Sequence, residues 1–80
     1  MDFPIVTLRQ LGRLIQDVRS QKGLTQQQLG DQAGFAQSAI SAIETDPKST
    51  KLERIFQLLS ALDLELVVRK RKIFISETEW

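Results

Sequence analysis

The sequence predicts a mostly α-helical domain of four to five helices, two of which form a helix-turn-helix, followed by a C-terminal β-strand that pairs across a homodimer. Two short amphipathic segments lie between Thr25 and Glu44 and are joined at Gly34. Further apolar residues recur at helical spacing on either side of this pair. Beyond Asp63, β-branched and other apolar residues replace the helical pattern, which favours a strand.

Length and composition limit the kind of protein this chain can be. Its 80 residues allow one domain with a thin core, and a chain this short often completes its core by dimerising. It has no cysteine and no histidine, which excludes disulfides, removes the usual zinc ligands and removes the commonest general base. We therefore expect no metal site and no cofactor.

Neither membrane insertion nor catalysis is expected. No apolar run approaches the length that spans a bilayer, and the first four residues do not form a signal peptide, so we expect a cytoplasmic protein without membrane contact. Several carboxylates fall on exposed positions without a nucleophile, base or metal beside them: Asp17, Asp31, Glu53 and Glu65. An enzyme is therefore not expected.

The first helix is expected to begin after Thr7, whose hydroxyl can cap it. Lys22 and Gly23 have the character of a helix C-terminus. The apolar positions between them keep the helical spacing: Leu8, Leu11, Ile15 and Val18.

The helix-turn-helix follows directly. Thr25 and Gln28 form a capping box that opens its first helix, and Gly34 can supply the left-handed residue that ends it. In the second helix, Ile40 and Ile43 are spaced to meet the same core as the first. An ordinary helical hairpin is the alternative that this pattern leaves open.

The segment from Gln32 to Ile43 carries no charged residue. Exposed helices normally carry many charges, so a helix without them usually packs against something. One interpretation is burial in the core, and the other is that neutral amides and hydroxyls read the edges of nucleic-acid bases. Gln37, Ser38 and Ser41 are too polar for a core, which favours base reading.

A polar loop at 45–49 leads to a fourth helix, for which Thr50 and Glu53 predict another capping box. Lys48 and Lys51 lie near its start and suit a phosphate, although a solvated surface explains them nearly as well. The residues expected to be buried by this helix are Leu52, Ile55, Phe56, Leu59 and Leu62.

The chain beyond Asp63 needs a partner, because lone strands are not stable. Residues 64–69 and 72–75 either form a hairpin, or one strand pairs with its copy in a second subunit. Residues 69–72 contain no glycine, asparagine or aspartate, which favours the intermolecular strand. We predict a domain at 1–63, a dimerisation strand at 64–75 and a flexible tail at 76–80. The expected interface residues are Leu64, Leu66, Val67, Val68 and Arg69.

The pattern of threonine, glutamine, glycine and isoleucine residues from Leu24 to Glu44 resembles the Xre/Cro-type helix-turn-helix family of DNA-binding proteins. Two departures affect local stability. Gly30 stands where the family usually has alanine, which is expected to weaken the helix by about 1 kcal/mol. Ala36 stands where a capping Ser or Thr is common, at a cost of about 1 kcal/mol.

The resemblance implies how the protein binds double-stranded operator DNA. In the family, the second helix of the domain crosses the DNA backbone and the third enters the major groove. It implies phosphate contacts for Thr25, Gln26, Lys48 and Lys51, with Gln26 also able to brace Gln37. It implies that Gln37 reads adenine, that Ser38 and Ser41 reach base edges or phosphates, and that Ala36 or Ala39 meets a thymine methyl group. It also implies an ion pair between Arg19 and Glu44, which we interpret as structural.

Residues at the end of the chain indicate a particular subgroup of this family. A small domain, a strand and a short tail that ends in Glu79 and Trp80 resemble the HipB-type antitoxins. This resemblance implies a dimeric repressor that binds a HipA-like Ser/Thr kinase toxin, with Trp80 entering the toxin. Packing of Trp80 on its own dimer is the alternative for the tail. A free-standing phage-type repressor without a toxin, or an inhibitor that has lost DNA binding, are the alternatives for the protein.

Overall fold

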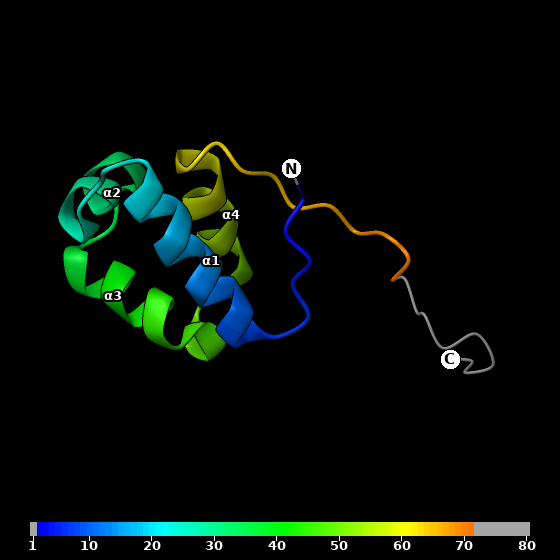
Figure 1. The fold of residues 1–80 in the computed structure, drawn as a ribbon. Helices are drawn as coiled ribbons and strands as arrows, with labels where there is room; N and C mark the ends of the chain where they lie inside the picture. The colour runs from blue at the N-terminus through cyan, green and yellow to red at the C-terminus, as the bar shows by residue number, and fades with distance from the viewer. Residues whose placement is uncertain (1, 72–80) are drawn as a thin grey trace.

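The computed structural model describes residues 2–71, which contain four α-helices and one short 3₁₀-helix. The elements are α1 (Leu8–Gln21), α2 (Gln26–Ala33), α3 (Gln37–Thr45), η1 (Pro47–Ser49) and α4 (Leu52–Ala61). Helices α2 and α3 lie together at one side of the bundle, and the N-terminal arm and the segment after α4 lie at the opposite side (Figure 1). The predicted helical domain is therefore confirmed, with the expected loop at 45–49 tightened into η1.

The ends of α1 and α2 are set by local hydrogen bonds, as predicted. Thr7 caps α1 in a capping box with Gln10, and Thr25 caps α2 in a capping box with Gln28. The C-cap residue of α1 is Lys22, just before Gly23, and that of α2 is Gly34, whose φ of 83° lies in the left-handed region that favours glycine.

The predicted capping box of α4 is wrong. The N-cap residue is Lys51, and its side chain makes no capping hydrogen bond. Thr50 instead closes η1, because its backbone N–H donates to the Pro47 carbonyl at 2.9 Å. The preceding 3₁₀ turn uses Thr50, so α4 begins one residue later than the pattern predicts.

The core lies between the four helices, and α4 contributes to it differently from the prediction. Leu52 and Phe56 were expected to be buried but are 61% and 47% exposed, while the unpredicted Leu58 is fully buried. The face of α4 that meets the core is the i, i+3, i+4, i+7 stripe from Ile55 to Leu62, and Leu52 and Phe56 lie beside it. The buried apolar residues are Ile15, Val18, Leu29, Ile40, Ile43, Ile55, Leu58, Leu59 and Leu62.

Helix α1 approaches the last turn of α3 closely at Gly12. A Cβ atom at this position would lie 2.7 Å from the carbonyl oxygen of Glu44, which is closer than real contacts allow. The missing side chain therefore lets the two backbones touch. This contact brings α1 beside the end of α3, where Glu44 is buried.

The segment after α4 is extended, and residues 2–71 contain no β-strand. Leu64 packs against the core, and the next apolar residues, Leu66 to Val68, are exposed. Arg69 pairs with Asp2 of the N-terminal arm at 2.7 Å. The pairing of this segment with a second copy stays a prediction. Its end at 72–75 and Trp80 lie outside the described residues.

Over residues 2–71, the structure contains no helix with the length and apolar character needed to cross a membrane.

Candidate nucleic-acid interface

The start of α2 and the exposed face of α3 form one polar surface. Thr25 caps α2 and is exposed, and Gln26 begins the helix and is half-buried. Gln37 and Ser38 open α3 and are exposed, and Ser41, one turn further on, is half-buried. Ala36 is the exposed N-cap residue of α3 and makes no side-chain capping bond, as predicted.

Helix α3 presents this surface because its opposite side is anchored in the core. Ile40 is fully buried and Ile43 is 2% exposed. Since these two residues fix which way α3 faces, Gln37 and Ser38 must point away from the core. The interpretation that the uncharged segment is simply buried is therefore wrong for these two residues.

A continuous chain of hydrogen bonds links Gln37 to the interior. Gln37 Nε2 donates to Gln26 Oε1 at 2.6 Å, and Gln26 Nε2 donates to Glu44 Oε1 at 3.0 Å. The first bond was expected from the resemblance, which implied that Gln26 can brace Gln37. The second bond was not expected, because Glu44 was interpreted only as the partner of Arg19.

The ion pair between Arg19 and Glu44 is present as expected. Arg19 Nε donates to Glu44 Oε2 at 2.5 Å and Nη2 donates to Oε1 at 3.3 Å, while Nη1 donates to the Leu24 carbonyl at 2.7 Å. The side chains are only 13% and 3% exposed. A buried pair of this kind adds little net stability, but the loss of one partner leaves a costly unpaired charge.

The two lysines suggested for phosphate lie at the other end of α3 and beyond it. Lys48 belongs to η1 and is 3.9 Å from the carboxylate of Asp46, with both side chains largely exposed. Such an exposed pair is weak and leaves the ammonium group available to a stronger anion. Lys51 is exposed at the start of α4.

A polar groove lined by α1, the start of α2 and the end of α3 was not among the predicted parts of the interface. Two arginines, Arg9 and Arg13, lie one turn apart on α1 and line it together with Gln26. The remaining lining residues are Gln16, Asp17, Ser20, Glu44 and Thr45. The i, i+4 spacing of the arginines was visible in the sequence, but only the packing of the helices places them in the same groove as Gln26.

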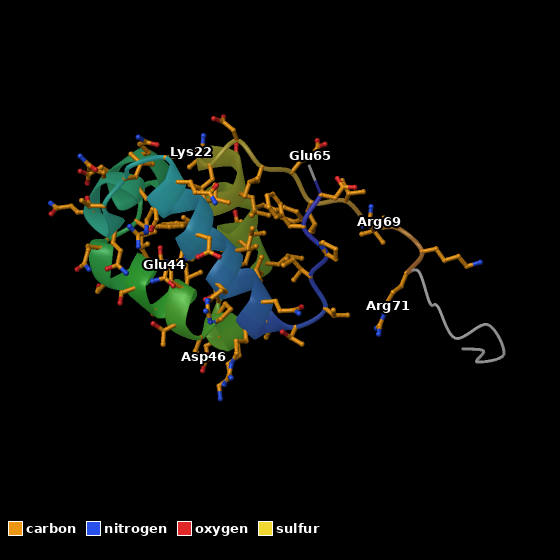
Figure 2. All side chains as sticks on the ribbon, viewed as in Figure 1. Lys22, Glu44, Asp46, Glu65, Arg69 and Arg71 are labelled. Atoms are coloured by element: carbon orange, nitrogen blue, oxygen red, sulfur yellow. The ribbon has the colours of Figure 1, made fainter. Side chains whose placement is uncertain are left out.

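The exposed apolar residues expected at a dimer interface lie away from this polar surface. Leu66, Val67 and Val68 are 51%, 66% and 91% exposed and belong to the segment at the opposite side of the bundle (Figure 1). Arg69 is also exposed there, and Figure 2 shows it beyond the body of the domain. Leu64 differs from the others because it packs on the core of its own chain.

Comparisons with known proteins agree with this geometry. The sequence matches the family described as Helix-turn-helix over residues 15–68. It is 36% identical to the antitoxin HipB of Escherichia coli K12 over 59 residues, which cover 74% of this chain and 67% of the relative. The same identity is found for HipB of E. coli O6:H1 strain CFT073, of whose length the match spans 63%.

Solved structures show the same fold. A HipB–O4 20mer complex superposes with a TM-score of 0.83 at 32% identity and covers 89% of this chain and 100% of that chain. A HipA–HipB–O2–O3 complex gives the same values. A mutant of the restriction-modification controller protein C.Esp1396I has a TM-score of 0.69 at 22% identity over 72% of this chain and 77% of that chain, which shows a shared fold.

Proposed function

The chain belongs to the Xre/Cro-type helix-turn-helix family and is similar to HipB antitoxins, and we propose that it is a dimeric, sequence-specific DNA-binding antitoxin. It represses its own operon in the cytoplasm and binds a HipA-like Ser/Thr kinase toxin. The similarity to HipB in an O4 20mer complex and in a HipA–HipB–O2–O3 complex supports both partners. This assignment is one of binding and not of catalysis.

The observation that carries DNA binding is the exposed, uncharged face of α3. An α-helix fits the major groove, and residues at the N-terminal end of such a helix contact base edges, with which amide and hydroxyl groups can form hydrogen bonds. Gln37 and Ser38 stand there, held outward by the buried isoleucines on the other side. In the major groove, Gln37 contacts adenine, Ser38 and Ser41 reach base edges or phosphates, and Ala36 meets a thymine methyl group.

Phosphate contacts position α3 in the groove. Thr25 and Gln26 stand at the N-terminus of α2, whose backbone N–H groups also favour an anion. Lys48 and Lys51 hold the phosphate backbone beyond the other end of α3. Arg9 and Arg13 add positive charge to the groove that Gln26 also lines.

The base-reading role of Gln37 is tested by a selection from randomised DNA duplexes, followed by affinity measurements. The Gln37→Ala variant is expected to lose about 1–3 kcal/mol on the selected site and little on random DNA. Lys48→Gln is the matched control, because the loss of a phosphate contact weakens both DNAs alike and lowers the salt dependence. Equal weakening of both DNAs by Gln37→Ala would contradict the assignment.

Dimer formation sets the spacing of the operator. Two copies of α3 related by a two-fold axis read half-sites one helical turn apart, roughly 34–36 Å, or a multiple of this distance. A selection that returned single, unpaired half-sites would contradict this proposal.

The tail is proposed to serve the toxin, because Glu77 and Glu79 repel phosphate and a terminal indole suits a groove on a protein partner. A chain that ends at Ser76 is expected to bind operator normally and to hold a HipA-like kinase more weakly. Because this truncation removes Glu77, Glu79 and Trp80 together, the Trp80→Ala variant is needed to measure the contribution of the indole alone. Unchanged kinase binding together with a lowered melting temperature would instead show that Trp80 packs on its own dimer. A wild-type protein that binds no kinase would favour a free-standing repressor.

A further inference from the structure

Four side chains connect the interior of the domain to its proposed base-reading face. Arg19 and Glu44 are nearly fully buried, Gln26 is half-buried and Gln37 is exposed. Figure 2 shows Glu44 at the meeting of α1, α2 and α3. Since each of these groups bonds to the next, the orientation of the outermost amide depends on the innermost carboxylate.

The carboxylate of Glu44 fixes the direction of this chain of bonds because it can only accept hydrogen bonds. It accepts from Arg19 Nε and Nη2 and from Gln26 Nε2. Because Gln26 turns its NH₂ group to Glu44, the oxygen of its amide faces Gln37. Gln37 must then turn its own NH₂ group inward. One buried acceptor therefore orients two amides.

The consequence is a defined pattern of groups on Gln37. One of its N–H groups bonds to Gln26, and a single N–H and the Oε1 oxygen are left for DNA. This donor and acceptor match adenine, which offers the N7 acceptor and the N6 donor in the major groove. Guanine offers two acceptors, N7 and O6, and would need two free donors.

We propose that Glu44 is a positioning residue that sets the preference of Gln37 for adenine over guanine without touching DNA. This inference rests on the proposed function, in which α3 enters the major groove. It assigns to Glu44 a role in sequence selectivity in addition to the structural role of its ion pair with Arg19.

The Glu44→Gln variant removes the carboxylate that orients Gln26 and Gln37, with little change in side-chain shape. Its amide has one acceptor oxygen in place of two, so it cannot satisfy both Arg19 and Gln26 as the carboxylate does. Gln26 is then free to reverse its amide, and Gln37 reverses with it, turning two N–H groups outward. The preference for adenine over guanine, expected to be about tenfold or more in the wild type, should disappear.

Two further variants separate this role from stability, because loss of the buried charge beside Arg19 destabilises the fold. Gln26→Leu breaks the chain of bonds but leaves the ion pair intact, and it should lose the same preference without unfolding. Ile55→Val is the matched control, since it lowers stability from the α4 side of the core. It should keep the wild-type preference.

The measurement uses the full chain and two duplexes in fluorescence-anisotropy titrations. The selection experiment identifies the base position at which the Gln37→Ala variant no longer prefers adenine. One duplex carries adenine at this position, and the other carries guanine. A wild-type affinity ratio in both Glu44→Gln and Gln26→Leu would overturn the role of Glu44. Failure of the wild type to select any sequence would overturn the proposed function itself, and with it this role.

Discussion

Gly30 illustrates how one residue serves a contact that helix propensity does not reveal. It lies in the middle of α2 and is buried, and a Cβ atom there would stand 2.5 Å from the carbonyl oxygen of Phe35. The backbone N–H groups of Gly34 and Phe35 both donate to the Gly30 carbonyl at 2.8 Å, which holds the turn against the helix. The glycine therefore allows the tight turn between α2 and α3.

Gly30→Ala is expected to destabilise the protein, contrary to what propensity alone predicts. Alanine gains about 1 kcal/mol as a helix former. Displacement of the Phe35 backbone costs about 1–3 kcal/mol, so the free energy of unfolding in urea should fall or at best stay unchanged. Gln27→Ala, at an exposed position of the same helix, is the control for propensity. A clear rise in stability for Gly30→Ala would contradict the close contact.

At the scale of the element, α3 is held by its buried face more than by its ends. Its N-cap residue, Ala36, has the extended backbone of a cap, with φ of −70° and ψ of 152°, but its side chain accepts no hydrogen bond. Isoleucines in the core and the close approach of α1 at Gly12 keep the helix in place. The first turn of α3 therefore lacks a side-chain cap at the end proposed to enter DNA.

Ala36→Ser is expected to stabilise the protein by about 1 kcal/mol, because a serine hydroxyl can accept from a free backbone N–H of the first turn. Thermal unfolding at fixed protein concentration measures the change. Ala39→Ser, inside α3, is the control and should stabilise nothing, since serine is a poorer helix former than alanine. Equal effects of the two substitutions would show that the increase in stability does not come from helix capping.

At the scale of the whole molecule, exposed apolar residues gather on the side of the bundle opposite α2 and α3. The N-terminal arm there exposes Phe3 and Val6, and the segment after α4 exposes Val67 and Val68. The pair between Asp2 and Arg69 ties these two segments together. Apolar surface gathered on one side of a small domain marks an interaction surface, which supports the proposed dimer.

Val67→Pro is expected to abolish the dimer, because proline cannot donate a backbone hydrogen bond to a neighbouring strand. Sedimentation at micromolar concentration should give a dimer for the wild type and a monomer or unfolded chain for this variant. Val67→Thr keeps both the N–H group and the β-branched side chain and should remain dimeric. A folded wild-type monomer at this concentration would contradict the proposed strand pairing.

The sequence by itself determined the helix boundaries of α1 and α2 and the helix-turn-helix between them. The caps at Thr7 and Thr25 were predictable because each partner lies three residues away, so the bonds depend only on local geometry. The uncharged, amide-bearing segment of α3 was equally visible. Family resemblance added the ion pair of Arg19 with Glu44, whose partners lie far apart in the chain.

Only the tertiary structure decided which face of each helix is buried and which side chains of different helices form hydrogen bonds. It turned Leu52 and Phe56 outward and Leu58 inward, because several apolar stripes compete on α4 and the neighbouring helices select one. It also placed Glu44 beside Gln26 at 3.0 Å. No periodicity within one helix reports such a contact, since it arises where the backbones of α1, α2 and α3 meet.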